Sequence, residues 1–337
     1  MSTRVDNLEI GEIMGGRAVL VVGSVNQDVV HRVPQLPSHG MTVIATRTEH
    51  FGGGKGANQS IAAARAGART ALVAAVGTDP AAGELLRELQ DAGVNTYSVH
   101  VSPGSTGSAT IAVAADGENF ILIAPGANSA VGTLDDIDLP WEGSEFAVVL
   151  TQGEIPAASV VSAHDYSRLH GVRFVMNLAP VIDLPAEVIS HANPLIVNEA
   201  EAAALLDLAG THPARIEDGA RAIYDTFGCT VVVTLGAQGA IVVDDVGTLT
   251  AVAAPRVEAP VDTTGAGDAF TGTVAAFLAR GASLIEAVRA GNAVGSLTVR
   301  SAGARASFVD LQQILGVIEN GTPDPNINSF TADSHLA

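Results

Sequence analysis

From position 146 onward, short apolar runs alternate with stretches of helical pattern. The apolar runs cover residues 147–150, 174–177, 195–197 and 231–235. The helical stretches between them cover residues 156–169, 199–208 and 215–227. Strands that alternate with helices of this length form βαβ units, in which the strands run parallel in one sheet and the helices cover its faces. The chain is therefore predicted to fold as an α/β protein around a mostly parallel sheet.

The first half of the chain extends this sheet and adds a smaller element. Strands are expected at 18–23 and 71–76, and helices at 59–66 and 81–91. Two strand-like runs, 108–115 and 120–124, are joined by Asp116-Gly117, a strong signal for a hairpin turn. Pro and Gly interrupt residues 29–50, which predicts short strands and turns. We therefore expect a small antiparallel insertion built from these early segments.

The last third of the chain completes the predicted domain. A second hairpin is expected at 239–253, and closing helices are expected at 266–280 and 283–300. We expect one domain over residues 18–318, with loose termini at 1–17 and 320–337.

The composition limits where the protein acts and what it binds. Of 337 residues, 47% are hydrophobic and only 4% aromatic, which suits a core of small apolar side chains. The formal net charge of −19 repels nucleic acids and anionic membranes, and we exclude both as partners. The one cysteine, Cys229, is expected to be a small buried hydrophobe. No apolar run is long enough to span a membrane, no signal peptide is recognisable, and a cytoplasmic protein is expected.

The most informative motif is Asp262-Thr-Thr-Gly-Ala-Gly-Asp268, which precedes an apolar run, 269–278, that is expected to form a buried helix. Glycines at a helix start let the backbone approach a bound group and leave N–H groups that favour an anion such as phosphate. A carboxylate beside such a site repels phosphate, but it can take a proton from a hydroxyl that attacks the phosphate. Asp268 is therefore either a base for phosphoryl transfer or an acidic residue in the first turn of an ordinary capped helix.

A glycine-rich turn, Gly52-Gly-Gly-Lys55-Gly-Ala-Asn58, precedes the first predicted helix. It does not fit the dinucleotide-binding fingerprint, because the first strand ends about thirty residues earlier and no acidic residue follows at the required distance. It does not fit a Walker A loop, because Gly56 occupies the position of the required Ser or Thr. The turn is instead expected to approach a ligand closely, with Lys55 and Asn58 directed at it. Lys55 is the only lysine in the chain.

Polar residues follow several predicted strands. Asn26 and Asp28 lie two apart, so they either share one face of an extended chain and chelate vicinal hydroxyls, or form an Asx-type turn. Asn198 and Glu201 lie three apart at a helix start, where they either hold water around Mg²⁺ or form a capping box, the commoner arrangement. Glu154 follows another strand end.

The loop Thr234-Leu-Gly-Ala-Gln-Gly239 follows the last of the predicted parallel strands. Its two glycines suit either contact with a nucleotide or an ordinary left-handed turn. The nine histidines are scattered and show no metal-binding spacing with the single cysteine, and no Gly-x-Ser-x-Gly nucleophile elbow is present.

Taken together, these residues resemble the PfkB sugar-kinase family, and its ribokinase members most closely. The motifs are Gly-Ser-Val-Asn-Gln-Asp (23–28), Gly-Gly-Lys-Gly-Ala-Asn-Gln (53–59), Ser-Thr-Gly (105–107), Pro-Gly-Ala-Asn (125–128), Asn-Glu-Ala-Glu (198–201), Thr-Leu-Gly (234–236) and Asp-Thr-Thr-Gly-Ala-Gly-Asp (262–268). Their order and spacing fit the family over residues 18–310. The resemblance implies a ribokinase-like three-layer α/β/α domain, in which segments near 29–50 and 106–124 form a small antiparallel β lid.

The resemblance implies ATP-dependent phosphorylation of D-ribose at its 5-hydroxyl, giving ribose 5-phosphate, with Asp268 as the base. The amides implied to form the anion hole belong to Gly265, Ala266 and Gly267. The residues implied to hold the sugar are Asn26, Asp28, Gly53, Gly54, Lys55, Asn58 and Glu154. The lid residues implied to pack on the sugar are Ala109, Ile111 and Ile121. In the ribokinase members such lids also pair two subunits, which implies a homodimer.

The resemblance further implies a nucleotide site and two ion sites. The residues implied to meet ATP are Asn198, Thr234, Gly236, Gly239, Gly267 and Asn292, with Glu201 near Mg²⁺ through water. The residues implied to bind K⁺ beside the anion hole are Asp262, Thr264, Thr298, Ser301, Gly303 and Ser307. Asn292 lies at a position that varies within the family, and Gly52, a third glycine before Lys55, is expected to loosen that loop. The alternatives are a nucleoside or deoxyribose kinase of the same family, or a catalytically silent sugar-binding regulator.

Overall fold

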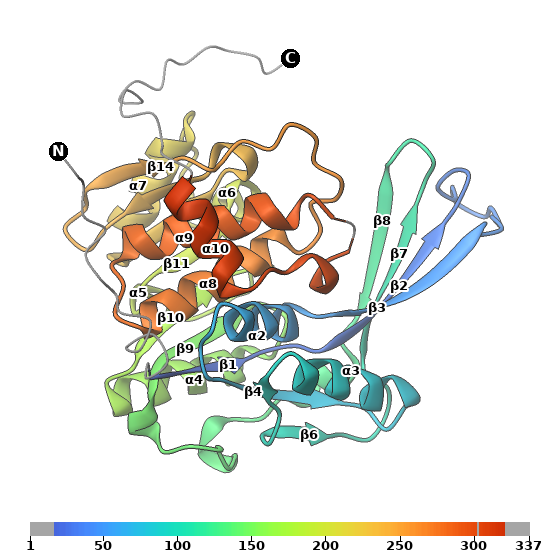
Figure 1. The fold of residues 1–337 in the computed structure, drawn as a ribbon, viewed down its shortest axis with the longest axis horizontal. Helices are drawn as coiled ribbons and strands as arrows, with labels where there is room; N and C mark the ends of the chain where they lie inside the picture. The colour runs from blue at the N-terminus through green and yellow to red at the C-terminus, as the bar shows by residue number, and fades with distance from the viewer. Residues whose placement is uncertain (1–16, 302, 321–337) are drawn as a thin grey trace.

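A computed structural model describes residues 17–301 and 303–320. The termini expected to be loose, 1–17 and 320–337, lie outside these residues except for Arg17 and Asn320. Figure 1 shows a layered α/β body and a small sheet that projects from one side of it. One layered body with one small additional sheet is the expected arrangement.

The main sheet runs through the centre of the body. Its strands are β1 (Ala18–Val22), β4 (Thr70–Val76), β5 (Val94–Asn95), β6 (Val99–Val101), β9 (Phe146–Gln152), β10 (Arg173–Asn177), β11 (Leu195–Asn198), β12 (Val231–Thr234), β13 (Ala240–Val243) and β14 (Leu249–Val252). Their order is β14-β13-β12-β11-β10-β9-β1-β4-β5, with β6 also paired to β4. Only the pairs β12–β13 and β13–β14 are antiparallel among these strands, so the predicted mostly parallel sheet and second hairpin are confirmed.

Helices cover both faces of this sheet. They are α2 (Lys55–Arg65), α3 (Pro80–Asp91), α4 (Ala157–His170), α5 (Ala186–Ser190), α6 (Glu199–Leu208), α7 (Ile216–Phe227), α8 (Ala266–Ala279), α9 (Leu284–Thr298) and α10 (Leu311–Asn320). Val19 and Val21 of β1 pack into one core with α2, α8 and α9, whereas Leu20 and Val22 pack into a second core with α4, α6 and α7. Because both faces are buried, the central strands are apolar throughout. The expected three layers are confirmed.

Helix α8 is buried along most of its length because it lies between α2 and α9. Gly272 permits the contact with α2: a Cβ there would lie 2.3 Å from the carbonyl oxygen of Gln59 and 2.7 Å from Cβ of Ala62. The prediction of a buried helix after the 262–268 motif is confirmed. The close packing also brings the first turns of α2 and α8 together, which matters for the site described below.

The projecting sheet consists of β2 (Asn26–Arg32), β3 (Arg47–Gly53), β7 (Gly107–Val113) and β8 (Asn119–Ala124), in the order β3-β2-β7-β8. The predicted hairpin at Asp116-Gly117 joins β7 to β8. The two outer pairs are antiparallel, but the central pair, β2 and β7, is parallel, so the sheet is mixed rather than wholly antiparallel. The reason is that β1 and β6 both run parallel to β4, and each continues outward into a strand of the small sheet.

The first helix begins earlier than its pattern predicted. Gly54, with φ of 89°, turns the chain directly into α2, so Lys55 and Asn58 lie in the first helical turn rather than in a loop. Several short elements and α10 were not expected from the sequence; the short ones include β5, β6, α5 and the 3₁₀ helix η5 (Arg305–Ser307). The short elements cannot be distinguished from loops by pattern, whereas α10 carries apolar residues at helical spacing and was missed.

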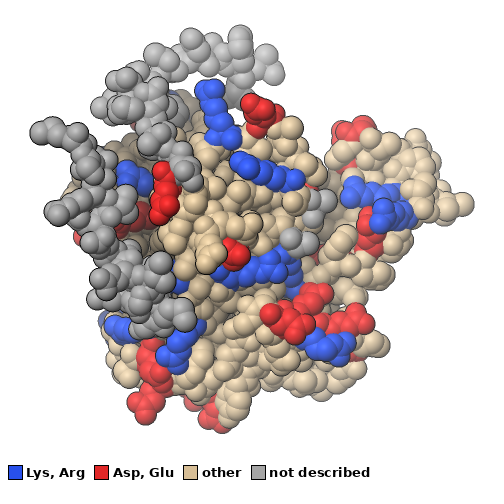
Figure 2. Space-filling view, in the orientation of Figure 1, with Lys and Arg blue, Asp and Glu red and all other residues tan. Residues whose placement is uncertain are grey.

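Charged side chains of both signs lie on the face of the molecule shown in Figure 2. Figure 2 shows acidic and basic residues interspersed on one face, including the small sheet. One pair on that sheet is Arg47–Glu49, with 2.9 Å between nitrogen and oxygen. Within the described ranges, no helix combines the length and hydropathy needed to cross a membrane.

Candidate active site

Polar residues from distant parts of the chain meet at the carboxyl edge of the main sheet. A cavity of about 130 Å³ lies where β11 and β12 end and where α6 and α8 begin. The sequence-predicted residues that line it are Lys55, Asn198, Glu201, Thr234, Gly265, Gly267 and Asp268. Ligands bind at this edge of α/β sheets because strand ends and helix N-termini converge there.

The start of α8 forms one wall of this cavity. Gly265 is the N-cap residue, with a left-handed φ of 79° that favours glycine. Of the three amides expected to form an anion hole, Gly265 and Gly267 belong to residues that line the cavity, whereas the N–H of Ala266 donates to Thr263 O at 3.2 Å. Asp268 lies in the first turn and is 8% exposed, and its carboxylate accepts hydrogen bonds from α2 rather than from its own helix. Asp268 therefore does not act as a helix cap.

Two amide side chains hold the Asp268 carboxylate. Asn58 Nδ2 donates to Oδ2 and Gln59 Nε2 donates to Oδ1, both at 2.9 Å. Gln59 Nε2 also donates to Asn177 Oδ1 at 2.9 Å, and Gln59 Oε1 accepts from Gln152 Nε2 at 2.9 Å. Gln152 and Asn177, at the ends of β9 and β10, thus hold Gln59 in place, and Gln59 in turn fixes the direction of the Asp268 carboxylate. The sequence did not predict roles for Gln59, Gln152 or Asn177. Its only signals were a polar residue in a buried helix, for Gln59, and polar residues at strand ends, for Gln152 and Asn177.

Lys55 is the basic side chain of the cavity. Burial lowers the pKa of its ammonium group, but the carboxylates of Asp268, Glu154 and Glu201 together outweigh burial and raise that pKa above its ordinary value. Lys55 is therefore protonated at neutral pH and can face an anionic ligand.

Glu154 holds the start of α2 in place. Its Oε2 accepts hydrogen bonds from the backbone N–H of Lys55 at 3.0 Å and from Ser24 Oγ at 2.5 Å. Gly56 lies so close to the same segment that a Cβ would be 2.4 Å from the nitrogen of Ser24. The structure thus places Glu154 beside Lys55, with Oε2 occupied by the helix start and Oε1 without a hydrogen bond within the described residues.

The expected sugar residues of the lid share one face of the small sheet. Asn26 and Asp28 lie two apart in β2, so the extended arrangement is confirmed and the Asx turn is not. The strand register puts Ala109 directly beside Asp28 and Ile111 two residues further along the same face. Ile121 pairs with Ile111 across the hairpin and is 52% exposed.

Asn26 is buried at the base of the lid. Asn128 Nδ2 donates to Asn26 Oδ1 at 2.7 Å, and Asn128 Oδ1 accepts from the backbone N–H of Val25 at 2.9 Å. Gly107 lies opposite, and a Cβ there would be 2.1 Å from Asn128 Nδ2. The oxygen of Asn26 is thus used by the protein, whereas its NH₂ group has no hydrogen-bond acceptor among the described residues.

The Asp28 carboxyl has an unusual pKa. Burial raises this pKa to about 6; the positive charge of Arg305 opposes the increase, and the negative charges of Glu154 and Asp268 add to it. Gly53 lies against the same side chain, because a Cβ there would be 2.1 Å from Asp28 Oδ1. Gly53 is therefore required for the position of Asp28.

Asn198 and Glu201 form the capping box that their spacing predicted. Asn198 Oδ1 accepts from the N–H of Glu201, and Glu201 Oε2 accepts from the N–H of Asn198, both at 2.8 Å. Burial raises the pKa of Glu201, with the hydrogen bond from Asn198 and the charge of Lys55 opposing it. Both side chains still line the cavity, so the capping interaction does not remove them from the site.

Three residues expected to meet the nucleotide do not line this cavity. They are Gly236, Gly239 and Asn292. Asn292 is buried, and its Nδ2 donates to the carbonyl oxygen of Val252 at 2.8 Å. Gly239 lies against the same carbonyl, since a Cβ would be 2.1 Å from it. Both residues therefore hold the end of β14 beside the site.

Asp262 joins the two segments that were expected to bind a monovalent cation. Its Oδ1 accepts from the N–H of Thr264 and its Oδ2 from the N–H of Gly303, both at 2.9 Å. Burial raises the pKa of Asp262, but these hydrogen bonds outweigh burial and lower the pKa below its ordinary value. Thr298 is fully buried, and its hydroxyl has no hydrogen-bond partner among the described residues. Ser301 is exposed, and Ser307 Oγ donates to Ala304 O at 2.6 Å.

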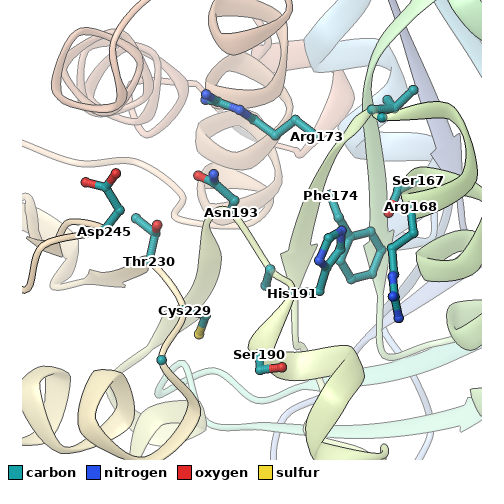
Figure 3. Close-up of a pocket in the computed structure, with 14 residues that line it drawn as sticks. Ser167, Arg168, Arg173, Phe174, Ser190, His191, Asn193, Cys229, Thr230 and Asp245 are labelled. Atoms are coloured by element: carbon teal, nitrogen blue, oxygen red, sulfur yellow. The ribbon is translucent and has the colours of Figure 1, made fainter.

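A second cavity, of about 600 Å³, lies at the opposite, amino-terminal edge of the sheet. Figure 3 shows its lining, which includes Arg173, His191, Asn193 and Cys229. It shares no residue with the smaller cavity and contains none of the residues expected to act on a ligand. Cys229 is 2% exposed, and burial raises the pKa of its thiol to about 12, so it is a buried hydrophobe as expected.

The metal-ligating side chains of the described part do not form a protein cage. No group of three or more His, Cys, Asp and Glu residues in that part is arranged to hold a metal ion. A divalent ion in the smaller cavity would therefore take most of its ligands from water and from substrate phosphates, which is usual for Mg²⁺.

A protonated lysine, a buried carboxylate and a glycine-capped helix start thus meet at the carboxyl edge of a mostly parallel sheet, an arrangement that can support the transfer of a phosphoryl group. The model of the pfkB family carbohydrate kinases matches residues 17–311. The chain therefore belongs to the PfkB family.

The chain is similar to several characterised members of this family. It is 34% identical to a ribokinase of Staphylococcus aureus over 299 residues, covering 88% of this chain and 98% of that one. It is 30% identical to a deoxyribokinase of Salmonella typhimurium over 298 residues, covering 88% of this chain and 96% of that one. The structure of an Arabidopsis thaliana ribokinase complexed with ribose and ATP matches with a TM-score of 0.79 and 27% identity, covering 90% of this chain and 99% of that one.

Proposed function

We propose that this chain is a ribokinase, which transfers the γ-phosphoryl group of ATP to the 5-hydroxyl of D-ribose and forms ribose 5-phosphate. The observation that carries this proposal is the buried Asp268 carboxylate, which Asn58 and Gln59 hold at a glycine-capped helix start. Asp268 lines the cavity and also acts electrostatically on Asp28 in the lid. The similarity to the Staphylococcus aureus ribokinase and to the Arabidopsis complex with ribose and ATP supports the same two substrates.

In this proposal, Asp268 accepts the proton of the sugar hydroxyl as its oxygen attacks the γ-phosphorus. The bond between the γ-phosphorus and the bridging oxygen breaks, and ADP leaves. The N–H groups at the start of α8 and the ammonium group of Lys55 stabilise the charge on the transferring phosphoryl group. The amides of Asn58 and Gln59 hold the base in one orientation, which reduces the entropic cost of reaching the reactive geometry.

The proposed sugar site lies between the lid and the start of α2. Asp28 accepts hydrogen bonds from two sugar hydroxyls, and the free NH₂ group of Asn26 donates to the sugar. Gly53 and Gly54 let the backbone approach the ring, and Ala109 and Ile111 cover it. The remaining proposed contacts are Lys55, Asn58, Glu154 and Ile121.

The proposed nucleotide site is the opposite side of the cavity. Asn198 and Thr234 line it, and Gly236, Gly239 and Asn292 position the segments on which the base and ribose of ATP rest. Glu201 would hold Mg²⁺ through water, because its carboxylate borders the cavity next to Lys55. When bound, Mg²⁺ offsets the charge of the β- and γ-phosphates.

We further propose K⁺ as an activating ion. The buried Thr298 hydroxyl, which has no partner within the described part of the chain, and the ionised Asp262 supply oxygen atoms near the start of α8, which fits a weakly hydrated monovalent cation. The other proposed ligands are Thr264, Ser301, Gly303 and Ser307. K⁺ would hold segments 262–264 and 298–303 in register and so fix the anion hole.

A homodimer in the cytoplasm completes the proposal. On the lid face opposite Asp28, β8 exposes two large apolar side chains, Phe120 and Leu122, which are 59% and 60% exposed. Exposed apolar patches of this kind favour burial against a partner. We propose that a second copy of this chain covers them.

The second candidate is a deoxyribose kinase, favoured by the similarity to the Salmonella typhimurium protein. A nucleoside kinase is a third candidate, and a silent sugar-binding regulator is disfavoured because Asp268 is present.

The deciding experiment is an ATP-consumption screen over pentoses, hexoses and nucleosides, with and without K⁺. We expect ribose to give the highest kcat/KM, and K⁺ but not Li⁺ to activate. Turnover of deoxyribose or of adenosine without turnover of ribose would refute the assigned substrate.

A further inference from the structure

Arg305 links three segments that surround the proposed sugar site. Its Nε donates to Asn58 Oδ1 at 2.9 Å, its Nη1 donates to Glu88 Oε2 at 2.8 Å, and its Nη2 donates to the carbonyl oxygen of Gly53. The Arg305 side chain is only 10% exposed. It lies in η5, between Gly303 and Ser307, two of the proposed K⁺ ligands. One buried guanidinium thus connects the proposed cation segment, to which Arg305 belongs, with α2, whose Asn58 hydrogen-bonds to Asp268, and with Gly53 at the base of the lid.

Gly52 provides the space for this guanidinium. A Cβ at position 52 would lie 1.9 Å from Arg305 Nη1 and 2.3 Å from Glu88 Oε2. Gly52 is the additional glycine that was expected to loosen the loop before Lys55. In the structure it has the opposite effect, because its missing side chain lets Arg305 fasten the loop.

The contact with Arg305 favours one orientation of the Asn58 amide. A guanidinium has only donors, so the atom of Asn58 that meets Nε is the oxygen. The NH₂ group of Asn58 must then face the other way, where it donates to Asp268 Oδ2. The ionised Asp268 carboxylate, which only accepts, favours the same orientation, so Arg305 adds to it by excluding the reversed amide, whose NH₂ group would face the guanidinium.

The charge of Arg305 also acts on the acidic residues of the site. The guanidinium interacts electrostatically with Asp28 and with Asp268, and it is the main charge that opposes protonation of Asp28. Glu88, which is 51% exposed, is its partner on the outer side. Arg305 therefore balances negative charge on the sugar side of the site, whereas Lys55 does so in the cavity.

We propose that Arg305, seated against Gly52, is a positioning residue for the sugar and for the base of this enzyme, acting through the orientation of the Asn58 amide. The inference rests on the proposed function, because it assigns Arg305 to the sugar side of that reaction. It predicts that Arg305 affects ribose and the chemical step, and leaves ATP binding unchanged.

The first test compares the kinetics of Arg305→Gln and Arg305→Lys with those of the wild type. Loss of a hydrogen bond from a charged group corresponds to about a 10- to 100-fold effect. We therefore expect kcat/KM for ribose to fall about 10- to 100-fold in Arg305→Gln, with KM for ribose raised and kcat lowered, and KM for ATP changed less than about twofold. Arg305→Lys keeps the positive charge but not the planar set of guanidinium donors, so we expect it to recover only part of the kcat/KM that Arg305→Gln loses. The matched control is Arg87→Gln on the exposed face of α3, which should behave as wild type.

The second test is a double-mutant cycle between Gly52→Ala and Arg305→Gln. Gly52→Ala displaces the guanidinium and should lower kcat/KM for ribose as Arg305→Gln does. In the Arg305→Gln background, Gly52→Ala should lower kcat/KM for ribose by less than about a further twofold, because the effects of coupled residues are not additive. Gly83→Ala, whose Cβ would meet nothing closer than Arg87 Nη1 at 3.7 Å, is the control for a glycine-to-alanine change.

Several outcomes would overturn the inference. They are Arg305→Gln kinetics within twofold of wild type, an equal rise in the KM values for ribose and ATP, or multiplicative effects of the two substitutions. The double-mutant cycle is repeated with the melting temperature of the ligand-free protein as the readout. This measurement requires no sugar turnover, so it reports the coupling of positions 52 and 305 even where a variant is inactive. A wild type that phosphorylates no sugar refutes the proposed function instead, whereas an active wild type with additive substitutions refutes only the role of Arg305.

Discussion

The carboxylate of Asp268 has a donor on each oxygen, and both donors belong to amides of neighbouring residues on α2. Such bonds favour one orientation of an ionised carboxylate, which suits a group that must accept a proton from a fixed direction. The residue cannot be replaced by its amide without placing NH₂ groups against each other. At the scale of single residues, the site is therefore specified by which side-chain atoms donate and which accept.

We predict that Asp268→Asn lowers kcat for ribose phosphorylation by about 10²- to 10⁴-fold, because the proton acceptor is lost. The expected KM for ATP changes little, since Asp268 does not bind the nucleotide in the proposed reaction. Steady-state kinetics of the purified variant provide the measurement, and Asp165→Asn, an exposed position on α4, is the control. Equal turnover by Asp268→Asn and the wild type would show that Asp268 is not the base.

Asp28 gives a prediction about pH. Its pKa is raised from 3.8 to about 6 in the folded protein, so the folded state binds a proton more tightly than the unfolded state does. The stability of the sugar-free protein should therefore fall as pH rises from about 4 to about 6, by roughly 1–3 kcal/mol. Asp28→Asn should remove this fall and be more stable than wild type at neutral pH, but not below about pH 4, in urea unfolding.

The same residue predicts the pH dependence of sugar binding. The ionised carboxylate is the form that accepts hydrogen bonds from hydroxyls, so ribose affinity should increase as pH rises through about 6. Calorimetric titration of ribose between about pH 5 and pH 7.5 measures this change. Affinity that is constant over this range, or stronger at the acidic end, would contradict a role for ionised Asp28.

At the scale of elements, the contact between α2 and α8 positions the site. The two helices come from segments that are about 210 residues apart in the chain, and Gly272 lets them approach closely. The first five residues of α2 include Lys55, Asn58 and Gln59, and the first turn of α8 contributes Asp268. A change in helix packing should therefore alter catalysis even where no site residue is changed.

We predict that Gly272→Ala destabilises the protein by about 1–3 kcal/mol, because overpacking forces the two helices apart. Its kcat should fall as well, since Asp268 moves relative to Asn58 and Gln59. Chemical denaturation and steady-state kinetics provide the two measurements. Gly295→Ala in α9, where a Cβ meets no atom within 4 Å, should be neutral or stabilising. Identical behaviour of the two variants would show that the α2–α8 contact is not tightly packed.

At the scale of the whole molecule, the small sheet has two apolar surfaces with different expected partners. Alternation along β7 and β8 directs Ala109, Ile111 and Ile121 to the face that carries Asp28, and directs Phe120 and Leu122 to the other face. The first face is proposed to cover the sugar. The second face is exposed in one copy of the chain and is proposed to pack against another copy.

We predict that the double substitution Phe120→Thr and Leu122→Thr converts the proposed dimer to a monomer, because it removes exposed apolar area from the second face. Light scattering coupled to size exclusion measures the mass. Leu169→Thr on α4, 78% exposed and far from the lid in sequence, should leave the mass unchanged. A wild type that is monomeric at all accessible concentrations would contradict the proposed dimer.

Local pattern determined much of this molecule in advance. The apolar runs predicted the parallel strands, Asp116-Gly117 predicted the hairpin, and glycines at 265 and 267 predicted the start of a buried helix. These features depend on neighbouring residues, whose spacing follows the period of a strand, a helix or a turn. The order of the motifs was sufficient to identify the family.

Only the tertiary structure decided how these pieces work together. It showed that Gln59 and Asn177 support Asp268, that Glu154 holds the start of α2, and that Gly52 makes room for Arg305. It also made the centre of the lid parallel, because β1 and β6 run in the same direction. The Arg305–Asn58 hydrogen bond spans 247 positions, and no periodicity in the sequence reports such a contact. Its existence depends on how the layers pack, and packing is a property of the whole fold rather than of any segment.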